Sequence, residues 1–142
     1  HRPERAKRHV RALRDVGGEV DLGTLCARAG VAPEFARRLE EYDLISARLA
    51  SGERYYREAD VEIATACALI ARHGLDARHL RAFRTAAGRQ SALLEQLVAT
   101  GLRSRDPERH RTAIGELEEL AAVAIELAQL LLLRDLREAA HP

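Results

Sequence analysis

Residues 21–56 read DLGTLCARAGVAPEFARRLEEYDLISARLASGERYY, and this stretch carries the signals that decide the fold. Asp21 is a typical helix N-cap and Gly30 a typical helix stop, so we expect a short helix between them. Pro33 suits the first turn of a second helix, which is expected to run to about Tyr42. Two short helices joined by a tight turn with a glycine predict a helix-turn-helix.

A small β-hairpin is expected directly after these helices. Leu44–Ile45 and Arg54–Tyr56 are short apolar or aromatic runs, and the polar turn Ala50–Glu53 between them contains a glycine. Short strands around such a turn are typical of a wing. Four of the five aromatic residues lie between positions 35 and 56, and we interpret them as closing a small core between helices and wing.

Three further helices are expected toward the C-terminus. The first spans roughly 58–73 and ends at Gly74. Asp76 then caps a long helix to about Leu102, and Asp106-Pro107-Glu108 restarts a helix that runs to about Glu138. The fold class predicted is therefore mainly α: a winged helix-turn-helix followed by a long helical hairpin. On the helix 58–73, one face is expected to carry Val61, Ala64, Ala68 and either Thr65 or Leu69.

The last helix carries two apolar stripes, too many for a single neighbour to cover. Burial by the preceding helix alone is one interpretation, and pairing with a second copy of the chain is the other. We predict a homodimer through this helix, with the direction of pairing left open. The residues expected at the dimer interface are Ile114, Leu117, Leu120, Ala124, Leu127 and Leu131.

Ala, Leu and Arg fill 69 of 142 positions, a composition that favours helices. The net charge of +1 argues against a uniformly cationic nucleic-acid binder. The charge is unevenly distributed along the chain, because residues 1–16 carry a net charge of +4 and residues 116–142 a net charge of −4. The basic segment is interpreted as the end of a linker or, alternatively, as a phosphate-binding arm.

The domain organisation predicted is a basic lead segment at 1–19, a winged-helix unit at 20–75 and a helical hairpin at 76–142. The sequence begins at His1 and contains no Met, which suggests a fragment of a longer protein. With neither a signal peptide nor a membrane-spanning apolar run, a cytoplasmic, nucleoid-associated protein with no membrane contact is expected.

Nothing in the sequence indicates an enzyme, a metal site or a cofactor. The six histidines form no HExxH pattern, and the chain has no GxSxG. Cys26 and Cys67 lie 41 positions apart on apolar helix faces, so core packing is the favoured interpretation over a thiol sensor. His73 and His79 are expected to be surface and cap residues. No residue pattern marks a pocket for a small-molecule effector.

The stretch Ala36–Leu44, the wing Gly52–Tyr56 and the pair Asp60-Val61 resemble the MerR-type winged-helix regulators in order and spacing. The resemblance implies a DNA-dependent regulator of transcription. The positions that match the family pattern are Arg37, Glu40, Leu44, Gly52, Arg54, Tyr56, Asp60 and Val61.

The C-terminal half is similar to a narrower group, the actinobacterial FtsR-type regulators. The similar segments are Ala77–Ala87, Leu94–Val98 and Arg105–Glu108. In those proteins a typical MerR-type DNA-binding domain precedes this region. The resemblance implies that the chain is the C-terminal part of such a regulator, linked to transcriptional control of cell division.

Two hypotheses about DNA remain open at this point. Residues 22–60 carry six basic and seven acidic groups, so the net charge of this stretch gives it little non-specific affinity for DNA phosphates. In the first hypothesis arginines still gather on one side and read double-stranded DNA; in the second the winged helix is a protein-interaction or effector-sensing module with no DNA contact. The DNA-binding candidates are Arg37, Arg38, Arg48, Arg54 and Tyr56.

Overall fold

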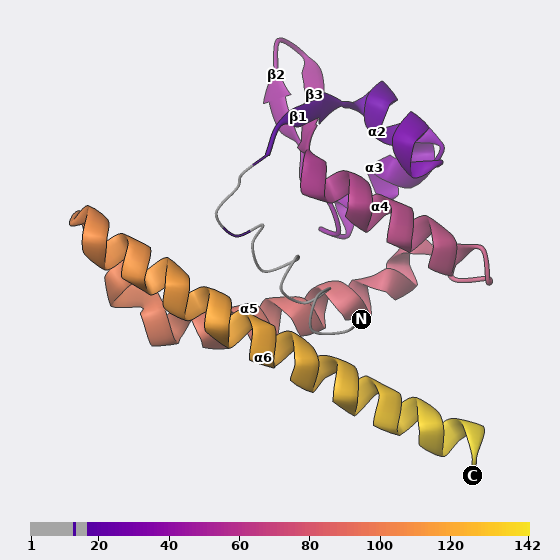
Figure 1. Ribbon diagram of the computed structural model, residues 1–142. Helices are drawn as coiled ribbons and strands as arrows, with labels where there is room; N and C mark the ends of the chain where they lie inside the picture. The colour runs from indigo at the N-terminus through magenta and orange to yellow at the C-terminus, as the bar shows by residue number, and fades with distance from the viewer. Residues whose placement is uncertain (1–12, 14–16) are drawn as a thin grey trace. The chain divides into compact units, whose positions relative to one another are not determined.

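A computed structural model describes residue 13 and residues 17–142 (Figure 1). The basic lead segment expected at 1–19 therefore lies mostly outside the described residues. By their contacts the described residues form two compact units, 17–88 (the winged-helix unit) and 89–142 (the hairpin unit). The elements in chain order are β1 (Glu19–Asp21), α2 (Leu22–Ala29), α3 (Pro33–Glu41), β2 (Arg48–Ala50), β3 (Glu53–Arg57), α4 (Glu58–Ala71), the 3₁₀ helix η1 (Ala77–Leu80), α5 (Arg81–Leu102) and α6 (Pro107–Ala140).

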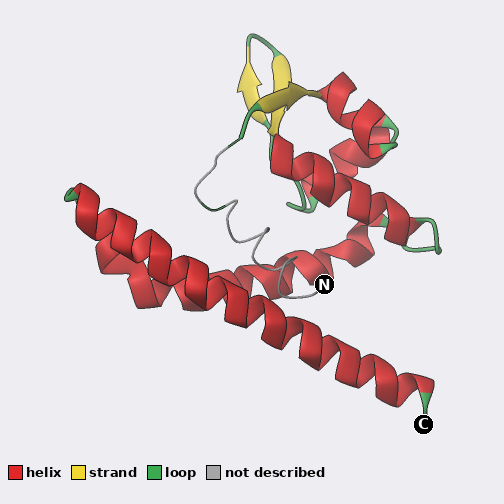
Figure 2. Cartoon of the chain, viewed as in Figure 1, coloured by secondary structure: helices red, strands yellow, loops and turns green. Residues whose placement is uncertain are grey.

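Helices and a small sheet together confirm the predicted fold class (Figure 2). The helix-turn-helix forms as its capping residues predict. The Asp21 side chain accepts a hydrogen bond from the backbone N–H of Thr24 at 2.8 Å. Gly30 ends α2 in the left-handed conformation, and Pro33 opens α3. Each boundary thus follows from one local residue with the required backbone or side-chain chemistry.

The sheet differs from the expected hairpin in two ways. It has three antiparallel strands in the order β1-β3-β2, and β1, which pairs Glu19 with Arg57, was not predicted. The strand expected at Leu44–Ile45 is wrong, because the chain turns there: Asp43 has a φ of 61° and Ile45 is buried in the core.

The wing turn itself is a two-residue connection between β2 and β3. Ser51 and Gly52 both have positive φ, 51° and 78°. This is the pattern of the type I′ turn, whose twist matches that of antiparallel strands. The polar turn predicted from the glycine is thereby confirmed, although the strand before it is Arg48–Ala50 and not the expected Leu44–Ile45.

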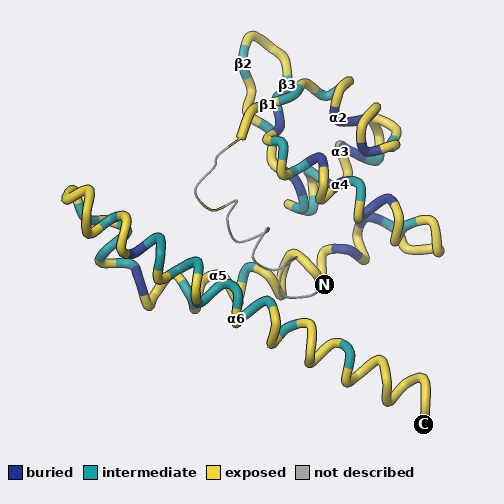
Figure 3. Tube along the Cα trace, in the orientation of Figure 1, coloured by how far each residue is buried: buried dark blue, intermediate teal, exposed yellow. Residues whose placement is uncertain are grey.

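Helix α4 packs against α2, β3 and η1 within the winged-helix unit. Its buried face includes Val61, Ala64, Cys67 and Ala68. Of the two alternatives for that face, Thr65 is half-buried while Leu69 is exposed, so Thr65 continues it. The core of the unit is shown in dark blue in Figure 3 and consists of Leu25, Cys26, Ala29, Ala36, Leu39, Ile45, Tyr56, Val61, Ala64, Cys67, Ala77 and Leu80.

The long helix expected after Asp76 begins differently from the prediction. Its first turn is the 3₁₀ helix η1, in which Asp76 and His79 form a reciprocal capping box, and α5 follows directly. The restart at Asp106 is confirmed, because its side chain accepts a hydrogen bond from the Glu108 backbone N–H at 3.1 Å. Among the described helices, none combines the length and the apolar character needed to cross a membrane.

The hairpin unit has very little core. Its buried residues are Val98 on α5 and Ala113 on α6. The two helices approach closely where Gly101 faces Ala113: a Cβ built on Gly101 would lie 2.6 Å from the Ala113 Cβ. Most large apolar side chains of α6 are exposed. Such exposure is unusual for a helix that packs against one neighbouring helix only.

Candidate nucleic-acid interface

Helix α3 carries two of the predicted DNA-contacting arginines. Ala36 and Leu39 are fully buried on its inner face. Because residues three to four positions apart share a helix face, Arg37 and Arg38 project away from the core, with about half of each side chain exposed. A recognition helix needs exposed side chains of this kind to contact DNA. Whether Arg37 and Arg38 can bind phosphate groups depends on the residues with which they are already paired.

Glu40, on the same helix, binds two of the predicted arginines. Arg54 of the wing forms an ion pair with Glu40 Oε1, and Arg37 Nε lies 3.5 Å from Glu40 Oε2. The Tyr56 hydroxyl donates to Glu40 Oε2 at 3.2 Å. One carboxylate, itself only 20% exposed, therefore neutralises part of the charge of two guanidinium groups and ties the wing to α3.

Tyr56 is a core residue rather than a surface residue. It is 0% exposed, and with Leu39 it belongs to the core cluster of the unit. Burial, and after it the charge of Glu40, raises the pKa of Tyr56 to about 12. With no exposed surface, Tyr56 cannot contact a duplex in this conformation, so its match to the family pattern reflects packing.

Arg38 is held by a different carboxylate. Its Nη2 forms an ion pair with Oδ1 of Asp76, the cap of η1. The hydrogen bond from Arg38 is the main reason that the pKa of Asp76 lies below its ordinary value. The Asp76 backbone N–H donates to Nδ1 of His79 at 2.9 Å, which confirms the capping role expected of that histidine.

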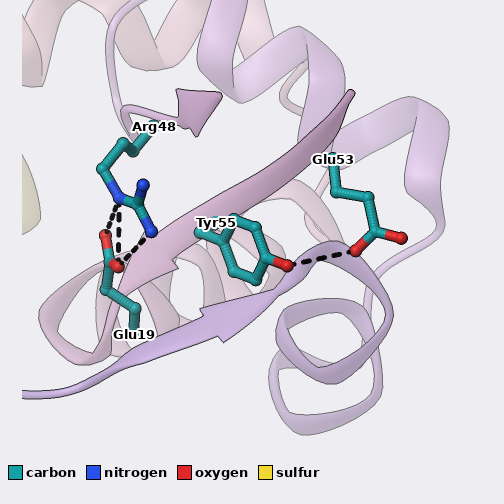
Figure 4. A network of polar contacts seen from close by, with 4 residues as sticks. All are labelled: Glu19, Arg48, Glu53 and Tyr55. Atoms are coloured by element: carbon teal, nitrogen blue, oxygen red, sulfur yellow. Dashed lines mark hydrogen bonds and ion pairs between the residues drawn. The ribbon is translucent and has the colours of Figure 1, made fainter. Parts of the chain in front are cut away.

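Arg48 lies on the outer face of the sheet (Figure 4). Its Nε and Nη2 donate to the Glu19 carboxylate at 2.9 and 2.8 Å, and its guanidinium lies 5.3 Å from the centre of the Tyr55 ring. This bidentate pair holds the pKa of Glu19 below its ordinary value. The Tyr55 hydroxyl donates to Glu53 at 3.2 Å.

The four predicted arginines thus lie on two surfaces. Arg48 is directly opposite Tyr55 across the strands, whereas Arg54 precedes Tyr55 by one residue and so points to the other face. Arg37, Arg38 and Arg54 do come together, because they line one surface hollow of about 420 Å³ with Glu40 and Glu41. The expectation that all four gather on one side is therefore met by three of them.

The acidic partners were the functional residues that sequence reasoning missed. Only the Arg37–Glu40 pair, three residues apart on a helix, has a spacing that could have indicated it. Arg48 and Glu19 are separated by 29 positions and Arg38 and Asp76 by 38. The first pair depends on β1, which was not predicted, and the second on the helix start at Asp76, which was predicted without its 3₁₀ turn.

No group of three or more potential metal ligands occurs within residue 13 and residues 17–142. Cys26 and Cys67 are free and buried, as the core interpretation predicted, and burial raises the pKa of both thiols. Among the residues predicted for dimerisation, Ile114, Leu117, Leu120 and Ala124 are half-buried, whereas Leu127 and Leu131 are exposed.

The architecture and the arginine-bearing helix define a winged helix-turn-helix unit joined to a helical hairpin. The chain belongs to the family described as Rv1828-like, C-terminal domain, whose profile matches residues 19–140. It is similar to two uncharacterised HTH-type transcriptional regulators, Rv1828 of Mycobacterium tuberculosis and Mb1859 of Mycobacterium bovis. Each is 33% identical over 87 residues, which cover 61% of this chain and 35% of the relative.

Proposed function

We propose that this chain is the C-terminal part of an HTH-type transcriptional regulator of the MerR type. In this proposal another part of the regulator reads the operator, and the winged-helix unit described above is a scaffold with little affinity of its own for DNA. The names of the relatives support the class of regulator. The segments similar to FtsR-type regulators support genes of cell division as the target.

The observation that carries the proposal is the pairing of the arginines. Arg37 and Arg54 share Glu40, Arg38 is paired with Asp76, and Arg48 with Glu19. Non-specific affinity for DNA comes mostly from arginine and lysine side chains that neutralise phosphates and release counterions. An arginine that already has a carboxylate partner must leave it first, and the freed carboxylate then repels the phosphate.

The second part of the proposal is a homodimer through α6. Support comes from α6, in which about nine turns of helix contribute a single buried residue, Ala113. Leu127, Leu130 and Leu131 are all more than two-fifths exposed. Pairing two copies would cover this apolar surface and would place two operator-reading parts in one regulator, as palindromic half-sites require.

Direct reading of duplex DNA by this unit is the second candidate. One observation favours it: Arg37, Arg38 and Arg54 surround a common hollow, and surface ion pairs are weak enough for phosphates to compete. The two candidates predict different behaviour of the chain on its own.

Electrophoretic titration over a salt series separates these candidates. The longer regulator is expected to shift a duplex that contains its operator, while the 142-residue chain alone gives no shift even at about 50 mM salt. A shift by the chain alone, weakening steeply with salt and lost in the Arg37→Ala/Arg54→Ala variant, would establish direct reading instead. Circular dichroism of the variant serves as the control for folding.

A further inference from the structure

Helix α4 is apolar on nearly all of its faces. Its sequence is EADVEIATACALIA, in which Thr65 is the only polar residue after the acidic first turns. One face is buried in the core, whereas Ile63, Leu69 and Ile70 are 39%, 52% and 36% exposed, and Ala66 among them is exposed as well. A helix that is hydrophobic all round is normally covered on more than one side. The described residues leave this outer face of α4, defined by Ile63, Ala66, Leu69 and Ile70, without such a cover.

The chain reaches the winged-helix unit directly beside the first residue of α4. The backbone N–H of Glu58 donates to the carbonyl oxygen of Gly18 at 3.1 Å, and a Cβ built on Gly17 would lie 3.6 Å from the Glu58 Cβ. Strand β1 is antiparallel to β3, and α4 directly continues β3. The chain before β1 therefore arrives at the end of the sheet from which α4 leaves.

The basic segment 1–16 has the composition that the outer face of α4 requires. Ala6, Val10 and Leu13 follow one another at intervals of four and three, which is the spacing of one helix face. Leu13 is 46% exposed. The segment carries a net charge of +4, whereas α4 contains three acidic residues and no basic one. A helix this short is marginal in water by itself and depends on packing against an apolar surface.

We propose that residues 6–16 dock as an amphipathic helix on the outer face of α4, antiparallel to it. The interpretations of the basic segment as a linker or as a phosphate-binding arm both leave it separate from the winged-helix unit. Docking instead makes the segment a part of that unit and covers the exposed aliphatic side chains of α4. The docking is independent of the proposed function, because it joins two surfaces of one chain.

The point of entry fixes the register of this helix pair. Gly17 lies beside Glu58, so positions before Gly17 run level with positions after Glu58. Counting four positions in each direction brings Leu13 to within one residue of Ile63. The facing pairs in that register are Leu13 with Ile63, Val10 with Ala66, and Ala6 with Ile70. Two of the three pairs set a large side chain against an alanine, which allows antiparallel helices to interdigitate closely.

Disulfide cross-linking of the 142-residue chain tests the contact and its register. Leu13→Cys/Ile63→Cys places two thiols at facing positions, and Leu13→Cys/Ile70→Cys, the matched control, places the second thiol about 10 Å farther along the same face. In oxidised glutathione we expect the first pair to form a bond within one chain roughly tenfold faster than the control. Peptide mass spectrometry separates this bond from any bond to the buried Cys26 or Cys67.

Amide hydrogen exchange gives a second measurement that needs no added thiol. We expect residues 9–16 of the wild type to exchange at least about tenfold more slowly than an unstructured peptide. Ile63→Asp should remove most of this protection, because a carboxylate then faces Leu13. Leu49→Asp is the matched control on β2, where the side chain is 65% exposed, and should leave the protection unchanged. Circular dichroism must be equal in all variants.

Three results would overturn the docking. The first is equal cross-linking of the two cysteine pairs. The second is exchange of residues 9–16 in the wild type at the rate of an unstructured peptide, including the case in which a different protein covers the outer face of α4. The third is a covalent dimer as the main cross-linked product, because the segment would then lie on the partner subunit.

Discussion

Replacing Leu39 by alanine is expected to lower the free energy of unfolding of the winged-helix unit by about 2–5 kcal/mol. Leu39 lies on α3, is 0% exposed and belongs to the core cluster that joins α2, α3, the wing and α4. Truncation removes buried apolar surface and leaves a cavity that the short surrounding elements cannot fill. The unit of 72 described residues has little stability to spare, so this loss would unfold much of the population.

Tyrosine fluorescence during urea unfolding measures this change selectively. All three tyrosines lie between positions 42 and 56, within the winged-helix unit, and the chain contains no tryptophan. Leu49→Ala is the matched control, because Leu49 lies on β2 and is 65% exposed. Equal losses for the two variants would show that Leu39 is not a core residue.

Gly101→Ala is expected to destabilise the contact between α5 and α6 by about 1–3 kcal/mol, although alanine is the better helix former. The added Cβ would lie 2.6 Å from the Cβ of Ala113, so the helices must move apart. Amide hydrogen exchange of residues 110–115, the first whose N–H groups bond within the helix, should accelerate accordingly. The compensating change Ala113→Gly should restore most of the protection in the double variant.

Gly115→Ala provides the control, because nothing lies within 4 Å of a Cβ built at that position. There the same substitution is expected to stabilise α6 by about 0.5–1 kcal/mol. Slower exchange in both glycine variants would contradict the close approach of the two helices at Gly101.

The elements that sequence reasoning located correctly are those with a local cause. Asp21, Gly30 and Pro33 each act on the backbone within four residues, and the same holds for Asp106. Caps, turns and helix starts can be predicted because the residue that causes them is part of the element. The wing turn at Gly52 belongs to this group.

The elements that were not predicted depend on residues far away in the sequence. Three residues, Glu19–Asp21, become β1 only because β3 offers a free edge 34 or more positions later. The partners of Arg38, Arg48 and Arg54 likewise depend on η1, on β1 and on the packing of the wing against α3. Sequence could therefore supply the arginines of the candidate interface but not the distant carboxylates, Glu19 and Asp76, that pair with two of them.

Whether the chain's own carboxylates keep its arginines from DNA can be measured by fluorescence anisotropy with a labelled duplex. The measurement compares the wild-type chain with Glu19→Gln/Glu40→Gln, which frees Arg37, Arg48 and Arg54 while glutamine can still accept the Tyr56 hydrogen bond. The matched control is Glu34→Gln/Glu62→Gln, which changes the net charge equally at two glutamates that have no ion pair with a described residue.

We expect the wild-type chain and the control to bind weakly, and the Glu19→Gln/Glu40→Gln chain to bind roughly tenfold more tightly at about 50 mM salt. Its salt dependence should also steepen by about two to three phosphate contacts. Equal gains in the two variants would contradict the role of these ion pairs, because net charge rather than freed arginines would then explain the binding. Tight binding by the wild-type chain would contradict it outright.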